Sequence, residues 1–396
     1  MKILIALGQD MTIGGHFNTT QAWVRELKRR GHTIVVLSKA GPPDLIKPFV
    51  DAGAQVRVFS RPEFVTGRRF AAGGYLLGAL EIARLLRRDQ IDLVQLHDSP
   101  VLNSGYFAAC LTRRPCVYLQ AGGEHRNIGV PSKCELVVLS EEQRKGYEAE
   151  GICATVILAR IDQEVFCPGQ CESEVSDMYR LPANGRRLIA ALRLEGAKKP
   201  WLDTIVGLVE AYGGAEPLHV ALAGGGQLYS QIEKTASFLN ARERKFGRLH
   251  LLGPIPDQNR MCDLYRWSDA FIGNGRGVME AMSTGKPAFV VGEQGEVELI
   301  AEDNIEEIGN ENFSGRHFRK RATKSKMGDE LLQVFDDKLM CHCASFSLAY
   351  ARANFSAAQG AIELETVHCR ARQNRLRDLL MWLLRRPKRS VRAGLS

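Results

Sequence analysis

The stretch GNGRGVMEAMSTGKP, from Gly273 to Pro287, decides the fold of this chain. Four glycines and one proline surround the helix-forming segment VMEAM, which carries a single carboxylate, Glu280. Apolar runs lie on both sides, DAFIG at 269–273 and PAFVV at 287–291. Two buried strands joined by a glycine loop and a helix form a βαβ unit, and ligands bind where the strand ends and the helix begins. Taken alone, the stretch could equally be an ordinary capped surface helix. The rest of the sequence is needed to distinguish this from a ligand-binding βαβ unit.

Short apolar runs rich in Val, Ile and Leu recur along the whole sequence. Such runs are typical of parallel strands that are buried on both faces. The runs are 3–7, 33–37, 55–59, 92–96, 116–120, 135–139 and 154–158, and then 187–192, 218–224, 249–253, 269–273 and 287–291. Helical segments separate them, as at Phe17, Thr20, Val24 and Leu27, at 70–88 and at 101–112. Strand and helix alternate, which predicts doubly wound α/β domains.

The length of 396 residues exceeds what one hydrophobic core usually fills, so two domains are expected. The alternation stops at FCPGQCESEVSD (166–177), which is rich in Pro, Gly and acids and has no periodicity. We therefore expect a first domain over 1–165, a linker over 166–177 and a second domain that begins at residue 178.

The net charge of +8 is concentrated at the C-terminal end. Between Arg370 and Arg392 there are nine Arg or Lys residues and one acid, Asp378. The remainder is close to neutral, which argues against a nucleic-acid-binding groove and for a local contact made by the tail.

The sequence contains no apolar run long enough to cross a membrane, and it enters a strand at once with MKILIALG. Its ten cysteines lack metal-ligand spacing. We expect a cytoplasmic protein with reduced thiols, no cofactor and no bound metal.

Two loops carry the residues that could hold a phosphate group. Gly14 and Gly15 follow the first strand and precede a helix, in a loop that does not match the dinucleotide fingerprint G-x-G-x-x-G. In ALRLEGAKKP, Arg193 ends a strand and Lys198 begins the next helix. A cation at each end of such a turn can bind a diphosphate, although an exposed basic loop is the simpler alternative.

Five strings occur in a fixed order: VILARIDQEVFCPG, RLEGAKKP, LAGGG, LHLLGPIPDQNRMCDLYRWSDAFI and GVMEAMSTGKPAFVV. In this order they resemble the large family of retaining, nucleotide-sugar-dependent glycosyltransferases with the GT-B fold, over most of residues 1–315. The resemblance implies two Rossmann-like domains that face each other across a cleft. The donor would lie mainly on the C-terminal domain and the acceptor mainly on the N-terminal domain.

The resemblance also assigns roles to individual residues. Arg193 and Lys198 match the diphosphate-binding pair, Glu280 matches the ribose-binding acid, and Gly15 matches the N-terminal glycine beside the phosphate. The expected donor-binding set is Gly14, Gly15, Arg193, Lys198, Gly253, Gly275, Arg276 and Glu280. The expected catalytic set is His97, at the end of the run DLVQL, together with Arg193 and Lys198. Other polar candidates on the acceptor side are His16, Glu124 and His125.

The chain departs from the family pattern at two places. The family has two glutamates spaced E-x7-E, and Ile272 stands at the first of these positions. Ala159-Arg160 stands where the family has Asn-Gly. Arg276 could take over a phosphate or sugar contact. No D-x-D triplet occurs, which fits metal-independent stabilisation of the leaving diphosphate by cationic side chains.

The expected function is the transfer of a hexose-type sugar from a nucleoside diphosphate to an acceptor hydroxyl, with retention, in glycan, glycolipid or cell-envelope polysaccharide synthesis. The expected partners are the nucleotide-sugar donor and a saccharide or lipid-linked saccharide acceptor, without nucleic acid. Two alternatives stay open. One is a nucleotide-sugar epimerase of the same architecture. The other is a catalytically silent scaffold, because Ile272 replaces the family's first glutamate.

The C-terminal residues divide into two segments. By the resemblance, 345–369 is a closing helix that returns from the second domain, over 178–344, to the first. In the tail over 370–396, Leu376, Leu379, Leu380, Leu383 and Leu384 fall on one face of a helix that Pro387 would end. This helix either packs on the protein or lies at an anionic membrane surface, which would make the protein peripheral to the inner face of the cytoplasmic membrane.

Overall fold

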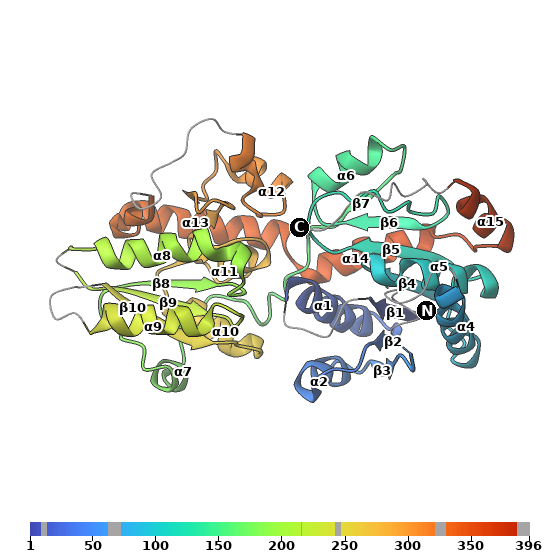
Figure 1. Cartoon of the computed structure of the whole chain (residues 1–396), viewed down its shortest axis with the longest axis horizontal. Coiled ribbons are helices and arrows are strands. Elements are labelled where there is room, and N and C mark those ends of the chain that lie inside the picture. Colours follow the sequence, from blue (N-terminus) through green and yellow to red (C-terminus); the bar gives the residue numbers. More distant parts are fainter. Residues whose placement is uncertain (9–13, 62–72, 215, 242–246, 321–329, 386–396) are drawn as a thin grey trace. The chain divides into compact units, whose positions relative to one another are not determined.

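The computed structural model describes residues 1–8, 14–61, 73–214, 216–241, 247–320 and 330–385 (Figure 1). The chain divides into two compact units, Met1–Ile157 with Gly360–Ser396, and Leu158–Gln359. Each unit is built on its own sheet. The fold is α/β, as the alternation predicted.

The first sheet has the order β3-β2-β1-β4-β5-β6-β7, and all its neighbouring strands are parallel. Its strands are β1 (Lys2–Leu7), β2 (Thr33–Ser38), β3 (Gln55–Val58), β4 (Leu93–His97), β5 (Cys116–Gln120), β6 (Glu135–Val138) and β7 (Thr155–Val156). All seven lie where the apolar runs predicted them. The central strands are buried on both faces and are therefore mostly apolar, while the edge strands β3 and β7 are more exposed.

The helices of the first unit are α1 (Gly15–Arg29), α2 (Pro43–Asp51), α4 (Gly73–Arg88), α5 (Ser99–Thr112), α6 (Glu141–Glu148), α14 (Ala357–Arg370) and α15 (Leu376–Arg385). The predicted stripe of α1, Phe17, Thr20, Val24 and Leu27, is buried. On one side of the sheet, residues of α4, α5 and α15 share a single hydrophobic core with the strands.

The second sheet has the order β10-β9-β8-β11-β12-β13. Its strands are β8 (Arg186–Ala191), β9 (Leu218–Ala223), β10 (Gly247–Gly253), β11 (Ala270–Gly273), β12 (Ala288–Val291) and β13 (Val297–Leu299). The first five are parallel and were predicted. The short edge strand β13 pairs antiparallel with β12 and was not predicted, because three residues give too little periodicity.

The second unit contains seven α-helices and three short 3-10 helices within the described residues. These are α7 (Ser173–Met178), η1 (Gly196–Lys198), α8 (Lys199–Ala211), α9 (Tyr229–Asn240), α10 (Gln258–Trp267), α11 (Arg276–Ser283), α12 (Ile305–Asn310), η2 (Arg316–Lys320), η3 (Glu330–Phe335) and α13 (Asp337–Asn354). No described helix is both long and apolar enough to cross a bilayer.

The chain leaves the first unit between Ile157 and Leu158, before the expected linker at 166–177. Ile161 forms a bridge with Ser356, and Phe166 is buried in a core of the second unit. The passage without periodicity therefore packs on the second unit, because single apolar residues anchor it without a repeating pattern.

The expected closing helix at 345–369 is two helices, α13 and α14. The Phe355 carbonyl accepts hydrogen bonds from the amides of Arg160 (2.8 Å) and Ile161 (2.7 Å). Because this carbonyl is turned away from the helix axis, α13 ends there and α14 begins afresh at Ala357. The chain returns to the first unit at Gly360, within α14.

The tail helix α15 packs on the first unit through one side only. Leu379 and Trp382 are buried, and the Trp382 Nε1 donates to the Gly129 carbonyl at 2.7 Å. The Trp382 ring also makes an edge contact with Tyr106, at 5.3 Å between ring centroids. The other leucines of the predicted face, Leu376, Leu380, Leu383 and Leu384, are exposed.

Candidate functional site

The carboxyl ends of five parallel strands meet at one edge of the second sheet, which we call the carboxyl edge. The loop with Arg193 and Lys198 follows β8, the loop Gly224–Gly226 follows β9, and Gly253 ends β10. Gly275 caps α11 after β11. The structure therefore brings the donor-binding candidates of the second unit to the edge where ligands of parallel sheets bind.

Glycines fix the position of the Arg193 loop. Gly224 has φ +147°, and a Cβ on it would lie 1.9 Å from the Leu192 carbonyl oxygen. The amide of Leu194 donates to the Gly225 carbonyl at 3.0 Å, and the amide of Gly224 donates to the Gly253 carbonyl at 2.8 Å. The loops after β8, β9 and β10 thus hold one another through their backbones, with Arg193 exposed at the end of β8.

Lys198 lies in the short helix η1 beside an aromatic ring. Its Nζ is 4.9 Å from the centroid of Trp201, at cation–π distance. Burial lowers the pKa of Lys198, the carboxylate of Glu293 opposes this, and the charge of Arg193 adds to it. Lys198, Arg193 and Glu293 are therefore electrostatic neighbours.

Glu293, which follows β12, joins this group to two further arginines. Arg319 donates to it from Nε (2.9 Å) and Nη2 (2.6 Å). The hydrogen bond from Arg319 lowers the pKa of Glu293, and the nearby charges of Arg316 and Lys198 act in the same direction. Arg193, Lys198, Arg316 and Arg319 form what we call the cationic cluster, with Glu293 as the acid among them.

Arg316 and Arg319 were not predicted as site residues. Their loop lies on the end of β12, since Gly315 has φ +78° and a Cβ on it would lie 2.1 Å from the Val291 carbonyl oxygen. The available signal was the basic string RHFRK directly after a glycine. It was missed because it follows no strand in the sequence.

Arg276 and Glu280 form a buried ion pair in α11. The Arg276 Nε donates to Glu280 Oε1 at 2.7 Å, and the Tyr265 hydroxyl donates to Glu280 Oε2 at 3.1 Å. Arg276 also donates from Nη1 to the Arg160 carbonyl at 2.8 Å. Because Glu280 is only 5% exposed, a ribose hydroxyl could reach its carboxylate only if one of these bonds moved.

A left-handed turn supports the start of α11. Asn312 and Phe313 have φ of +59° and +56°. The Gly275 amide donates to the Phe313 carbonyl at 2.6 Å, and Asn312 accepts from the side chain of Arg160. Such backbone conformations cost of order 1–3 kcal/mol each and persist where the surroundings impose them. Ile272, at the position of the family's first glutamate, is a residue of β11 and is buried in the core of the second unit.

In the first unit, Gly14 and Gly15 lie at the start of α1, with Gly14 at the cap position.

His97 ends β4 of the first unit and is only 3% exposed. Both its ring nitrogens have partners, Thr20 Oγ1 at Nδ1 (3.0 Å) and Gln95 Nε2 at Nε2 (2.6 Å). Burial, together with the charges of His16 and His368, lowers the pKa of His97 to about 3.

These bonds bear on the prediction that His97 is catalytic, which stays a prediction. The Thr20 hydroxyl donates to the His16 carbonyl, so it accepts from Nδ1 of His97. Nε2 of His97 then accepts from the amide of Gln95, which leaves neither nitrogen to exchange a proton with a substrate. The structure favours a structural role for His97.

The neighbouring residue Asp98 was not predicted. It is buried, has φ +66°, and its Oδ1 accepts from the Ala121 amide at 3.1 Å, which ties the loops after β4 and β5 together. His125, in the second of these loops, lies 3.1 Å from Glu150. Asp98 was missed because a single residue with unusual backbone geometry leaves no periodic signal in a sequence.

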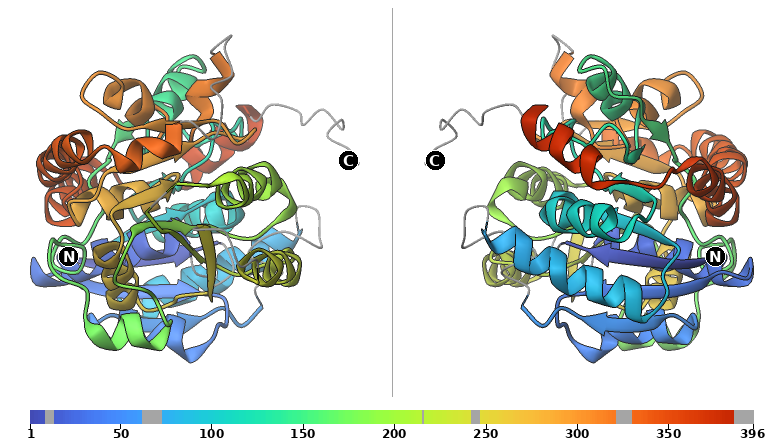
Figure 2. Two further views of the ribbon diagram at one scale, coloured as in Figure 1. Left: turned by 90° about the vertical axis from the view of Figure 1, so that its left-hand side faces the viewer. Right: turned by 90° about the vertical axis from the view of Figure 1, so that its right-hand side faces the viewer.

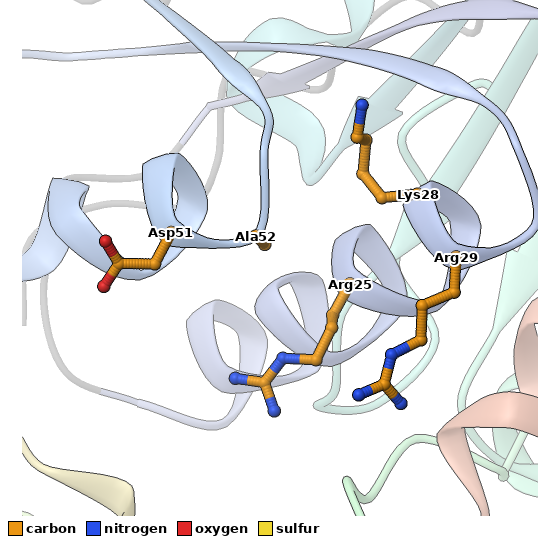
Figure 3. A pocket seen from close by; sticks show the side chains of 5 residues that line it. All are labelled: Arg25, Lys28, Arg29, Asp51 and Ala52. Carbon is orange, nitrogen blue, oxygen red and sulfur yellow. The ribbon is translucent and has the colours of Figure 1, made fainter.

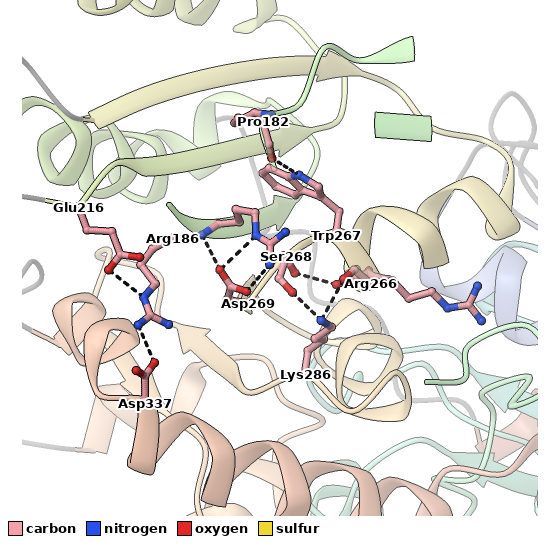
Figure 4. Close-up of polar contacts among 11 residues, drawn as sticks. Pro182, Arg186, Glu216, Arg266, Trp267, Ser268, Asp269, Lys286 and Asp337 are labelled. Atoms are coloured by element: carbon pink, nitrogen blue, oxygen red, sulfur yellow. Dashed lines mark hydrogen bonds and ion pairs between the residues drawn. The ribbon is translucent and has the colours of Figure 1, made fainter. Parts of the chain in front are cut away.

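Two other polar groups lie at the opposite, amino-terminal edges of the sheets. A pocket of about 460 Å³ is lined by Arg25, Lys28, Arg29, Asp51 and Ala52, where α1 and α2 end (Figure 3). In the second unit, ion pairs and hydrogen bonds join the starts of β8, β11 and β12 (Figure 4). These contacts include Arg187 with Asp269, and Lys286 with the carbonyls of Arg266 and Ser268. We assign a structural role to this network, because it ties the starts of the strands together.

Among the described residues, no group of His, Cys, Asp and Glu is arranged to hold a metal ion.

Comparisons with known proteins agree with this architecture. Residues 13–122 match the family described as Glycosyltransferase Family 4. A search of curated proteins found no match. Among solved structures, a glycosyltransferase from Rickettsia africae is 15% identical with a TM-score of 0.68, covering 93% of this chain and 97% of its own. HepE of Anabaena in complex with UDP-glucose is 17% identical with a TM-score of 0.65, covering 92% and 98%.

A third similar structure comes from Listeria monocytogenes and is assigned as a UDP-N-acetylglucosamine 2-epimerase. It is 15% identical with a TM-score of 0.57, covering 92% of this chain and 94% of its own. At such identities a structural match establishes the fold alone. The chain therefore has the GT-B fold of these glycosyltransferases, and part of its first unit matches a glycosyltransferase family.

Proposed function

We propose that the protein is a glycosyltransferase that moves a sugar, with retention, from a nucleoside diphosphate to an acceptor hydroxyl. The observation that carries the proposal is the cationic cluster at the carboxyl edge of the second sheet. Three cations act on the carboxylate of Glu293 and a fourth, Arg193, lies near one of them, which leaves an excess of positive charge in the cluster at the edge where a ligand of this fold binds. A diphosphate supplies the matching negative charge and accepts hydrogen bonds from Arg and Lys.

The cluster can also lower the barrier to transfer. As the bond between sugar and diphosphate breaks, negative charge grows on the leaving phosphate oxygen. Positively charged donors that are already held in place stabilise this charge in the transition state. Arg319 is oriented by Glu293, and Lys198 is held beside Trp201, so these two need little reorganisation when the charge develops.

The ribose contact of Glu280 is part of the proposal. Glu280 would accept from ribose hydroxyls after the bond from Tyr265 or from Arg276 has moved. Arg276 would then be released to contact the phosphate or the sugar, in the region where the family's first glutamate is replaced by Ile272.

We further propose a saccharide or lipid-linked saccharide as acceptor, in glycan, glycolipid or envelope polysaccharide synthesis, and a cytoplasmic location. The match of residues 13–122 to a glycosyltransferase family supports an acceptor site on the first unit. The ten free cysteines are compatible with a reducing compartment.

A panel of nucleotide sugars tests the proposal by thermal shift. A ligand that binds only the folded protein raises its melting temperature, by an amount equivalent to about 2.7 kcal/mol at a hundred times Kd. The donor found in this way is then incubated with candidate acceptors, and the product is identified by mass spectrometry. If no nucleotide sugar stabilises the protein, it is a silent scaffold and the proposal is wrong.

The structural match to the Listeria protein favours an epimerase as the second candidate. An epimerase would interconvert the sugar of its nucleotide substrate without any acceptor. Incubation with the donor alone, followed by separation of sugar epimers, distinguishes the two activities. A transferase gives at most slow hydrolysis in this experiment.

A further inference from the structure

The outer sides of α4 and α15 expose an unusual number of large apolar side chains. More than half of the exposed large hydrophobic side chains among the described residues belong to these two helices. We call this set the leucine face, and it consists of Leu76, Leu77 and Leu80 on α4 and Leu376, Leu380, Met381, Leu383 and Leu384 on α15.

Both helices belong to the first unit and flank α5. Each of them contacts α5, and Figure 2 shows the three helices side by side on one side of the unit. The inward sides are used for packing, since Ile82 and Leu86 of α4 and Leu379 and Trp382 of α15 lie in the same core. The exposed leucines are therefore additional to what the fold of this unit requires.

Basic side chains accompany the leucine face. The second half of α4 exposes Arg84, Arg87 and Arg88, and α15 and the segment before it expose Arg372, Arg375 and Arg377. The acids on the two helices are engaged with backbone amides, Glu81 with Ser60 and Asp378 with Arg375. In the sequence, the eleven residues that follow α15, over 386–396, include four more basic residues and no acid.

We infer that the leucine face and its arginines dock on the surface of an anionic lipid bilayer. Leucine side chains enter the boundary between headgroups and acyl chains, while arginines extend their charged ends to lipid phosphates. Each basic residue close to an anionic membrane strengthens the contact.

A second copy of this chain fits the same surface poorly. Two-fold symmetric contacts bring identical patches together, so the exposed arginines of both copies would lie in one interface, where Arg88 is paired with Asp89 of its own chain. Removing such like charges from water is costly when no acid pairs with them. The charge of this surface therefore selects lipid over self-association.

Sedimentation of the full-length protein with vesicles tests the inference. We expect binding to vesicles of phosphatidylglycerol and phosphatidylcholine, little binding to phosphatidylcholine alone, and release by high salt, because salt screens exposed charges. Leu380→Gln/Leu384→Gln should weaken binding about tenfold or more. These side chains are 61% and 80% exposed, so the substitution leaves the core intact.

A second double variant, Leu76→Gln/Leu80→Gln, tests the contribution of α4 and should also weaken binding. The matched control is Leu332→Gln, which changes a leucine of the second unit that is 42% exposed and should leave binding unchanged. Equal binding to both kinds of vesicle, or unchanged binding of the α15 variant, overturns the inference. Unchanged binding of the α4 variant overturns the part of it that concerns α4.

Sedimentation velocity of the same proteins without lipid examines the alternative. If the wild type is a dimer and the leucine variants are monomers, the face is a self-association surface and the lipid inference is wrong. Nucleotide-sugar binding of each variant is measured in parallel. It should equal that of the wild type, so failure of the membrane contact is separable from failure of the proposed activity.

Discussion

Three cationic side chains, Lys198, Arg316 and Arg319, are electrostatic neighbours of Glu293, and Arg193 is a neighbour of Lys198. Arg319 takes both oxygens of this acid, at 2.9 and 2.6 Å. Arg193 is left exposed at the end of β8, and the glycine loop after β9 fixes its backbone. Because Arg193 is exposed and its backbone is held in place, it is well placed to receive a phosphate.

Arg193→Ala should weaken binding of the donor's nucleoside diphosphate about tenfold or more, because a hydrogen bond to a charged group contributes about 1.5–3 kcal/mol. Isothermal titration calorimetry measures the change, with the nucleoside diphosphate of the donor that the thermal-shift panel identifies. Lys234→Ala, which removes an exposed cation from the middle of α9, is the control and should bind this nucleotide as the wild type does. Equal affinity of the folded Arg193 variant would remove this residue from the site.

Glu280→Gln should destabilise the protein by about 3–5 kcal/mol, since it breaks a buried ion pair and leaves the charge of Arg276 without its partner. Urea denaturation followed by circular dichroism gives the free energy of unfolding. Arg276→Met/Glu280→Leu removes both charges and should cost less than Glu280→Gln alone. If the double variant is the less stable one, the pair is a net stabilising interaction and our reading of its energetics is wrong.

At the scale of elements, a chain of buried side-chain hydrogen bonds joins α1, β4 and α14. Thr20 accepts from His97, Gln95 donates to His97, and the Oε1 of Gln95 accepts from Nε2 of His368 at 2.8 Å. At the rim of α14, Glu365 is 2.6 Å from His32. A proton added to Nε2 of His97 would face the Gln95 amide, which is itself a donor, so the network requires a neutral His97.

The pKa of His97 and that of His368 are each lowered to about 3, in both cases chiefly by burial. Unfolding restores values near 6.5, so below this pH the unfolded chain binds more protons and the folded state loses stability. Each histidine should add about 1.4 kcal/mol per pH unit to this loss between about pH 6 and 4. His368→Gln should reduce the slope of unfolding free energy against pH by that amount, measured by urea denaturation. A slope equal to that of the wild type would show that His368 also takes up its proton when folded.

The helix α15 is both a packing element and an exposed one, and the two roles use different residues. Trp382→Ala should lower the free energy of unfolding by about 3–5 kcal/mol, because it empties a core position of the first unit. Leu384→Ala, at a position that is 80% exposed, should change it by less than about 0.5 kcal/mol. Thermal and urea denaturation of the two variants decide whether this difference exists; similar losses would mean that Leu384 is buried in solution.

At the scale of the whole molecule, the sequence was sufficient for the parallel strands of both sheets and insufficient for the features that join them. Apolar runs such as 33–37 and 218–224 predict strands because central parallel strands are apolar at every position. The edge strand β13, the break at Phe355 and the packing of Phe166 each depend on one or two tertiary contacts, which leave no period in the sequence.

The residues of the candidate site were likewise predictable from the sequence only in part. Arg193 and Lys198 were predictable, because strand ends and helix starts meet at the carboxyl edge of a parallel sheet. Arg316 and Arg319 reach that edge through a glycine turn laid on β12. A histidine at a strand end, such as His97, can point into the protein or out of it, and the sequence does not show the contacts with Thr20 and Gln95 that decide its direction.

Binding of the donor's nucleoside diphosphate should slow hydrogen exchange in the second unit, over the loops 192–198, 224–228 and 314–319. The reason is that these loops carry or support the cationic cluster, and a ligand that bridges them reduces their opening. Exchange measured by mass spectrometry with and without this nucleotide locates the effect. Protection confined to the first unit would place the nucleotide elsewhere.

The chain passes from the first unit to the second after Ile157 and returns at Gly360. This path has a consequence during synthesis. The second unit is one uninterrupted segment, so it can fold as soon as it has left the ribosome, since domains generally fold as units. The first unit is begun earlier but completed later, because Trp382, which fills part of its core, is made after the whole second unit. Until then its sheet lacks α14 and α15, and the unfinished half is the part of the nascent protein most exposed to chaperones and proteases.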